Sequence, residues 1–135
     1  MNLEPLKGLK GFVYLATPYS KYPAGKEQAF IDACVIAGKM IERGIGVFSP
    51  IAHSHVIAQH ARIDPDSHAI WLPADQFLMD KADAIVVALM LGWSESRGVA
   101  YEIVEFEKAC KPIFYLDPTD GIISAQDVDW SKVTR

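Results

Sequence analysis

Glu102 is the residue of this chain whose type and position are best suited to chemistry. The apolar run 82–89 predicts a strand, and residues 97–110 predict the helix after it, with Glu102 near its start. Ligands of open α/β sheets bind at the carboxyl ends of the strands, and a helix start stabilises an anion. We therefore expect Glu102 to be ionised, on the border of the buried face. It is then either a nucleophile that attacks a sugar or a plain solvated helix residue.

Asp75 is a second carboxylate that the topology brings to the same edge. Pro73 is typical of the first turn of a helix, so we predict a helix over 73–81 with Asp75 two residues into it. Glycosidic chemistry uses paired carboxyl groups, of which one attacks and the other donates a proton. We expect Asp75 to be the proton donor, with a pKa raised by its neighbour. The alternative is an acidic residue that only interacts favourably with the helix dipole.

Aromatic, hydroxyl and imidazole side chains follow the other predicted strands at this edge. They could stack on a base, hold a phosphate or contact a sugar, and Tyr14 within the first strand is a candidate for the catalytic centre or for the core. Ser96 is also a candidate helix cap, and Gly98 allows a close backbone approach. The predicted substrate contacts are Thr17, Tyr19, Ser20, His53, His55, Ser96 and Gly98.

The sequence predicts neither a metal nor an organic cofactor. The four histidines match no familiar zinc spacing, and no cysteine lies near them. The loop after the first strand lacks the G-x-G-x-x-G fingerprint of dinucleotide binding. A metal-dependent hydrolase that uses the histidines stays open as a minor alternative.

Strand-like and helix-like segments alternate along the chain. Strands are predicted over 12–16, 45–48, 82–89 and 112–116, and helices over 30–41, 73–81 and 97–110. This alternation predicts an α/β fold: a small, doubly wound, Rossmann-like parallel sheet of four to five strands flanked by helices. We expect a mobile excursion with about one helical turn over 51–72. The tail 117–135 is polar and has no strong hydrophobic periodicity of a helix or a strand.

The composition indicates one globular domain over residues 1–135, with 50% hydrophobic and 22% charged residues. A net charge of -4 argues against a nucleic-acid polymer as partner. No apolar run approaches the roughly 20 residues of a membrane span, and the first ten residues lack a secretory signal. Cys34 and Cys110 lie among apolar neighbours, so we expect buried, reduced thiols and a cytoplasmic protein.

Three segments resemble the nucleoside 2-deoxyribosyltransferase superfamily. They are Val-Tyr-Leu-Ala at 13–16, an Asp about one helix before the strand Ala-Asp-Ala-Ile-Val-Val at 82–87, and Ser-Arg-Gly-Val-Ala-Tyr-Glu-Ile at 96–103. The resemblance covers roughly residues 12–117, and the branch most similar is the 2'-deoxynucleoside 5'-phosphate N-hydrolases. It implies Glu102 as nucleophile on the sugar C1', Asp75 as its acidic partner and Tyr14 as an active-site tyrosine. It also implies phosphate contacts at Ser96 and Gly98, and a homo-oligomer, dimer or tetramer.

The chain departs from that branch in two places. Its first loop reads Thr-Pro-Tyr-Ser-Lys over 17–21 instead of a loop with glycine and arginine, so the need for a 5'-phosphate stays open, with Lys21 or Lys26 as substitutes. The segment 51–72 is longer than in the compact members. It also resembles small bacterial and phage proteins that share Ser-Pro-Ile-x-His-Ser-His, from which no reaction carries over.

Together these observations predict an enzyme that acts on a small nucleoside or nucleotide. The expected reaction is cleavage or transfer of the N-glycosidic bond of a nucleoside or (deoxy)nucleoside 5'-monophosphate, with Glu102 as nucleophile and no cofactor. The alternative is a non-catalytic nucleotide-binding or sensing module, in which Glu102 only hydrogen-bonds ribose hydroxyls.

Overall fold

The computed structural model describes residues 1–132 and has a five-stranded sheet as its centre. The strands lie in the order β2-β1-β3-β4-β5; the first four are parallel, and β5 is antiparallel to β4. This confirms the predicted Rossmann-like α/β class, with β5 added from the tail. The strands are β1 (Val13–Ala16), β2 (Val47–Phe48), β3 (Ala84–Ala88), β4 (Ile113–Asp117) and β5 (Gly121–Ile123).

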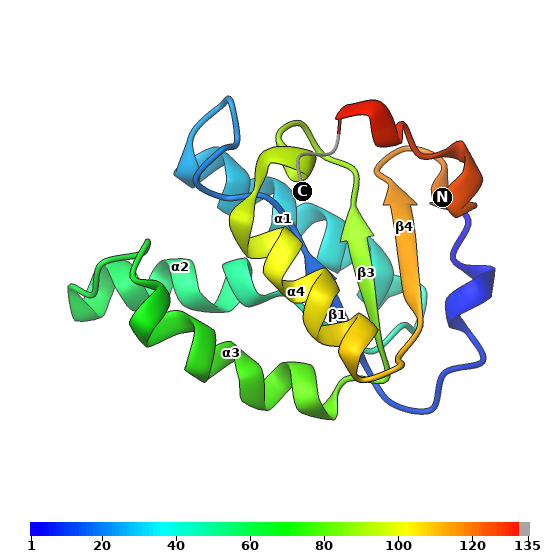
Figure 1. The fold of residues 1–135 in the computed structure, drawn as a ribbon, viewed down its shortest axis with the longest axis horizontal. Coiled ribbons are helices and arrows are strands. Elements are labelled where there is room, and N and C mark those ends of the chain that lie inside the picture. The colour runs from blue at the N-terminus through cyan, green and yellow to red at the C-terminus, as the bar shows by residue number, and fades with distance from the viewer. Residues whose placement is uncertain (133–135) are drawn as a thin grey trace.

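Four helices connect the strands and cover both faces of the sheet. They are α1 (Lys26–Glu42), α2 (Pro50–Ala61), α3 (His68–Lys81) and α4 (Arg97–Lys108). In Figure 1, α4 lies in front of the sheet and α1 behind it, while α2 and α3 extend to the left. The other regular elements of the described residues are short 3-10 helices at Glu4–Leu6, Trp93–Glu95, Ala125–Asp127 and Trp130–Lys132.

The two central strands, β1 and β3, are buried along their whole length. Alternate side chains point to opposite faces of a strand. Val13 and Leu15 of β1 therefore join the core that contains α1, whereas Tyr14 and Ala16 join the core that contains α3 and α4. A strand covered on both faces is apolar throughout, which explains the uninterrupted hydrophobic run of β3. Tyr14 brings a polar hydroxyl group into the core that contains α3 and α4.

Segment 51–72 is mainly helical, so the prediction of an irregular excursion was wrong. Helix α2 begins at Pro50, and the Ser49 hydroxyl oxygen accepts a hydrogen bond from the Ala52 amide at 3.2 Å. The periodic signal was weak because α2 packs mainly on α1, and Val56 and Ile57 stay 37% exposed. Without a continuous buried stripe, a helix lacks its usual sequence pattern.

Helix α3 also begins earlier than predicted, at His68. Pro73 lies inside the helix and not in its first turn. The ring costs one intrahelical hydrogen bond there, a cost that packing against α4 offsets. Asp75 consequently lies in the second turn of α3, and its predicted place in the first turn was wrong.

The loops after β1 and β3 meet at the carboxyl edge of the sheet. Gly92 has φ of +86°, and a Cβ atom there would lie 2.5 Å from the Lys21 carbonyl oxygen. Glycine is therefore required by both the backbone conformation and the close approach. This contact fixes the loop before α4 against the loop before α1.

Both cysteines are free thiols, but they are not equally buried. Cys34 is half-buried in α1, whereas Cys110 is exposed just after α4, with φ of +55°. The predicted burial of Cys110 was wrong because α4 ends at Lys108 and the chain turns outward. Within residues 1–132, no helix is long and apolar enough to cross a membrane.

Candidate active site

A cavity opens at the carboxyl edge of the sheet, between the first loop, α2, α3 and the start of α4. Both predicted carboxyl groups, Asp75 and Glu102, line it. So do the predicted substrate contacts Thr17, Tyr19, Ser20, Ser96 and Gly98. The structure therefore brings together residues that lie up to 85 positions apart in the sequence (17 to 102).

Tyr14 and Glu102 form a buried hydrogen bond at the base of this site. Tyr14 is fully buried in β1, and its hydroxyl donates to Oε2 of Glu102 on α4. The tyrosine ring is held between Phe48 and Phe106, with centroids 6.0 and 5.7 Å away. Burial, together with the charge of Glu102, raises the pKa of the Tyr14 hydroxyl far above its usual value. Tyr14 therefore keeps its proton and acts as a fixed donor.

Glu102 is only 8% exposed, although its edge reaches the cavity. Burial raises the pKa of its carboxyl group to about 8, an effect that the Tyr14 hydrogen bond opposes and the charge of Asp75 reinforces. The expectation that the helix start keeps Glu102 ionised was therefore wrong. Loss of water outweighs the helix dipole here, because a buried carboxylate has lost most of its solvation.

Asp75 approaches the same cavity from α3 and is half-buried. Burial raises the pKa of its carboxyl group to about 6. The predicted direction of this shift is confirmed, but its main cause is desolvation and not the neighbouring carboxylate. Between about pH 6 and pH 8, the two carboxyl groups consequently hold one proton between them.

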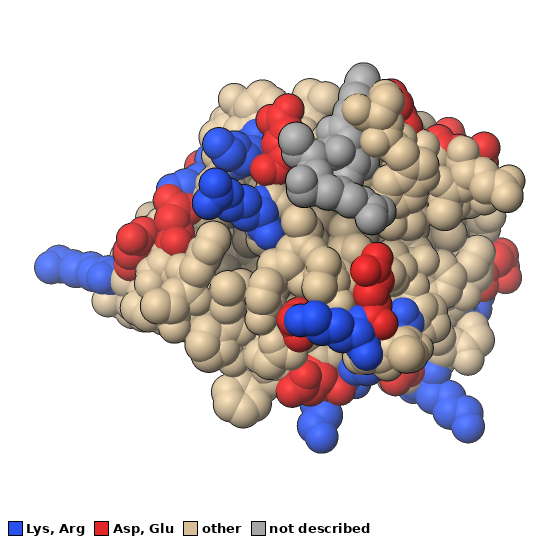
Figure 2. Space-filling model, in the orientation of Figure 1, with Lys and Arg blue, Asp and Glu red and all other residues tan. Residues whose placement is uncertain are grey.

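The start of α4 and the loop after β1 supply further polar groups to the cavity. The Ser96 hydroxyl oxygen accepts a hydrogen bond from the Val99 amide at 3.2 Å, which caps the helix. Thr17 is 4% exposed, and its hydroxyl has no hydrogen-bond partner among the described residues. Two basic side chains, Lys21 and Arg97, also line the cavity. Figure 2 shows Lys and Arg side chains beside a hollow over the start of α4.

His53 and His55 lie outside the cavity. His53 is exposed and packs against Phe48, with ring centroids 5.5 Å apart. Nδ1 of His55 is 2.7 Å from the Tyr19 hydroxyl, and its Nε2 is 2.7 Å from Oε2 of Glu27. His55 therefore orients Tyr19, whose side chain lines the cavity, without reaching the cavity itself. The direct substrate contacts predicted for the two histidines are not brought to this site.

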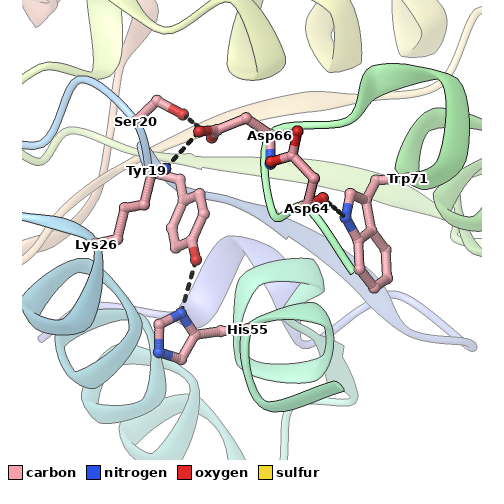
Figure 3. A network of polar contacts seen from close by, with 7 residues as sticks. All are labelled: Tyr19, Ser20, Lys26, His55, Asp64, Asp66 and Trp71. Carbon is pink, nitrogen blue, oxygen red and sulfur yellow. Dashed lines mark hydrogen bonds and ion pairs between the residues drawn. The ribbon is translucent and has the colours of Figure 1, made fainter. Parts of the chain in front are cut away.

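The loop between α2 and α3 is tied to the loop after β1. The Ser20 hydroxyl donates to Asp66 Oδ1 at 2.6 Å, and Lys26 forms an ion pair with the other carboxylate oxygen (Figure 3). These hydrogen bonds hold the pKa of Asp66 below its usual value. Ser20 and Asp66 both line the cavity, so their hydrogen bond forms part of its wall.

Sequence reasoning missed several cavity residues because of the misplaced start of α3. The missed residues on α3 are His68, Trp71 and Leu72. With the predicted Asp75 they are spaced at i, i+3, i+4 and i+7, so all four share one helix face and line the cavity. That spacing was a usable signal. Arg97 was also missed, although it lies between Ser96 and Gly98.

The described histidines do not form a metal centre. Within residues 1–132, no group of three or more His, Cys, Asp or Glu side chains is arranged to hold a metal ion. His55 is engaged by Tyr19 and Glu27, and His53 points elsewhere.

The whole site lies in a segment that matches one protein family. A sequence model described as "Domain of unknown function (DUF1937)" matches residues 11–117. The chain belongs to this family. The DUF1937 segment includes β1 to β4 and every residue that lines the cavity. No curated protein is significantly similar to the chain.

Proposed function

We propose that this protein cleaves or transfers the N-glycosidic bond of a nucleoside or (deoxy)nucleoside 5'-monophosphate. One observation carries the proposal: two carboxyl groups with raised pKa values share a cavity, and one of them is hydrogen-bonded to a buried tyrosine. Glycosidic chemistry needs one carboxylate and one carboxylic acid at the same site. The sequence resemblance to nucleoside 2-deoxyribosyltransferases supports this interpretation.

In the proposed reaction, a Glu102 oxygen attacks the sugar C1'. The bond between C1' and the base nitrogen breaks, its electrons go to the base, and Asp75 donates a proton to that base. A glycosyl ester on Glu102 results. Water or a second base then attacks C1' and loses its proton to Asp75, and the Glu102 carboxylate is regenerated.

The reaction requires the shared proton to lie on Asp75. In the free protein the higher pKa belongs to Glu102, so the proton resides mainly there. The Tyr14 hydrogen bond favours the Glu102 carboxylate, and positive charge that develops on the sugar favours it further. We propose that substrate binding moves the proton to Asp75.

The polar groups around the start of α4 are proposed to hold the sugar and its 5' substituent. Ser96, Gly98 and Arg97 offer a hydroxyl, a helix-start backbone and a positive charge. Thr17 adds a buried hydroxyl that has no protein partner among the described residues. Lys21 provides the positive charge of the first loop. These groups suit either a phosphate or the free 5'-hydroxyl of a nucleoside.

A non-catalytic nucleotide-binding or sensing module is the second candidate. The raised pKa of Glu102 favours it, since a neutral carboxyl group at pH 7 can donate a hydrogen bond to a ribose hydroxyl. This module would bind nucleotides and release no base.

A panel of ribo- and deoxyribonucleosides and their 5'-monophosphates tests the proposal, with free base measured by chromatography. We expect base release by the wild type, no release by Glu102→Gln, and normal release by Glu107→Gln, an exposed residue of the same helix. Binding without release by the wild type would favour the sensing module. Neither binding nor release of any panel member would contradict both candidates.

We further propose a homo-oligomer in the cytoplasm. Phe77 and Leu91 are each 74% exposed, and burial of these large apolar side chains between copies of the chain would stabilise an assembly. Two free cysteines are typical of a reducing compartment. Light scattering on purified protein measures the assembly, and a monomeric mass would contradict it.

A further inference from the structure

A tryptophan ring lies in the cavity wall one helical turn before Asp75. Trp71 and Asp75 are separated by four residues on α3, so their side chains lie on the same face of the helix, and both line the cavity. Trp71 is half-buried. A group that receives a proton from Asp75 would therefore be a close neighbour of the indole.

The orientation of Trp71 is fixed by a hydrogen bond. Its ring nitrogen Nε1 donates to the Asp64 carbonyl oxygen at 2.9 Å, and Asp64 Oδ1 accepts from the Asp66 amide at 2.9 Å (Figure 3). Asp66 is in turn tied to Ser20 and Lys26. Because the ring nitrogen is the one polar atom of indole and is already satisfied, the ring offers a ligand only apolar contact.

The surroundings of Trp71 leave its ring available. Among the described residues, no aromatic ring packs against it, whereas Trp93 and Trp130 pack edge-on against each other at 6.3 Å. The apolar side chains Pro50, Ile51 and Leu72 line the same cavity. An indole with a satisfied nitrogen, an apolar surround and no protein ring partner suits a planar aromatic ligand.

We propose that Trp71 is the platform on which the base of the substrate stacks, and that it selects aromatic leaving groups. This inference rests on the proposed function and adds a residue for base recognition. The larger face of a purine would overlap the indole more than a pyrimidine does. Trp71 then places the departing base beside Asp75, at the position where it needs a proton.

Binding is measured by calorimetry in the Glu102→Gln background, which the proposed mechanism cannot turn over. The ligands are deoxyadenosine, deoxycytidine and 2-deoxyribose, which lacks a base. We expect Trp71→Ala to weaken deoxyadenosine binding about tenfold or more, as stacking contacts do, and Trp71→Phe to retain most of it. Binding of 2-deoxyribose should stay unchanged.

Two further variants serve as a replacement for the alanine variant and as a control. Trp71→Leu preserves apolar bulk without an aromatic face, so it replaces the alanine variant if that one fails to fold. Ile70→Ala, at a 49% exposed position of the same helix that does not line the cavity, should bind like the parent. Deoxyadenosine binding within twofold of the parent in Trp71→Leu would overturn the inference, as would equal weakening for 2-deoxyribose.

The same measurements separate this inference from the proposed reaction. If the wild type releases base but the Trp71 variants bind deoxyadenosine normally, the stacking role is wrong and the reaction stands. If the wild type releases no base but binding depends on Trp71, the stacking role stands and the reaction is wrong. If no nucleoside or 5'-monophosphate of the panel binds or releases base, both are wrong.

Discussion

The Tyr14 hydroxyl donates a hydrogen bond to Glu102 and so joins the central strand β1 to the helix that covers it. Tyr14 is fully buried, so its hydroxyl has no access to water as a substitute partner. The bond stabilises the Glu102 carboxylate against a burial penalty that otherwise keeps the group protonated. The protonation state of the cavity therefore depends on this pair.

Tyr14→Phe should shift the pH dependence of the proposed reaction toward higher pH. Loss of a donor to the carboxylate raises the pKa of Glu102 further, so a smaller fraction is ionised at pH 7. A rise of one unit lowers the rate at pH 7 about tenfold and moves the alkaline limb of the profile, near pH 8 in the wild type, up by about one unit. Initial rates of base release from pH 5 to 10 measure the shift.

Tyr22→Phe is the matched control, because it removes a tyrosine–carboxylate hydrogen bond, to Asp32, outside the cavity. Its pH profile should be that of the wild type. A Tyr14→Phe profile with an unshifted alkaline limb would contradict the role of the hydroxyl.

The wild-type rate should follow a bell-shaped pH profile. The reaction needs one proton on the carboxyl pair, so the rate should rise through about pH 6 and fall through about pH 8. Profiles of kcat/KM, which describe the free enzyme, are the relevant measurement. A rate that keeps rising to pH 10 would exclude a required acid in this pair.

Asp75→Asn should slow poor leaving groups much more than good ones. Asparagine has no acidic proton to donate, but a leaving group of low basicity departs without one. We expect a loss of about 100-fold or more for natural nucleosides and a small loss for a nitrophenyl 2-deoxyriboside. Equal slowing of both substrates would remove Asp75 from the role of proton donor.

Glu102→Gln should make the fold less sensitive to alkaline pH. A carboxyl group whose folded-state pKa is raised from 4.5 to about 8 stabilises the fold fully below pH 4.5, and that stabilisation is lost as pH rises through 8. Glutamine does not ionise, so the variant avoids a loss on the order of a few kcal/mol. Thermal melts at pH 5 and pH 9 measure it.

The comparison for that experiment is again Glu107→Gln, which changes an exposed charge on the same helix. Its melting temperature should fall with pH as the wild type's does. If Glu102→Gln and the wild type lose equal stability between pH 5 and pH 9, Glu102 is not buried as described.

Base release should continue in excess EDTA. The proposed nucleophile and acid are both side chains of this protein, so no step requires a divalent cation. Activity after dialysis against chelator is the measurement. Loss of activity that added zinc or manganese restores would instead favour a hydrolase that uses the histidines.

Much of the architecture could be predicted from the sequence because it depends on local patterns. The uninterrupted apolar run of β3 and the periodic helix around Phe106 predicted a parallel sheet, and topology then placed Glu102 and Asp75 at one edge. Helix α2 and the early start of α3 were missed, since α2 has no continuous buried stripe and Pro73 lies inside a helix.

The sequence by itself determined that two carboxyl groups meet at one edge of the sheet, because the positions of Asp75 and Glu102 follow from strand and helix order. Only the tertiary structure decided their charge and their neighbours. The pKa of Glu102 depends on how completely the sheet and Tyr14 exclude water from it, and no local pattern encodes that exclusion. His55 stays outside the cavity and Trp71 lines it, because the packing of α2 and α3 decides which face of each helix reaches the cavity.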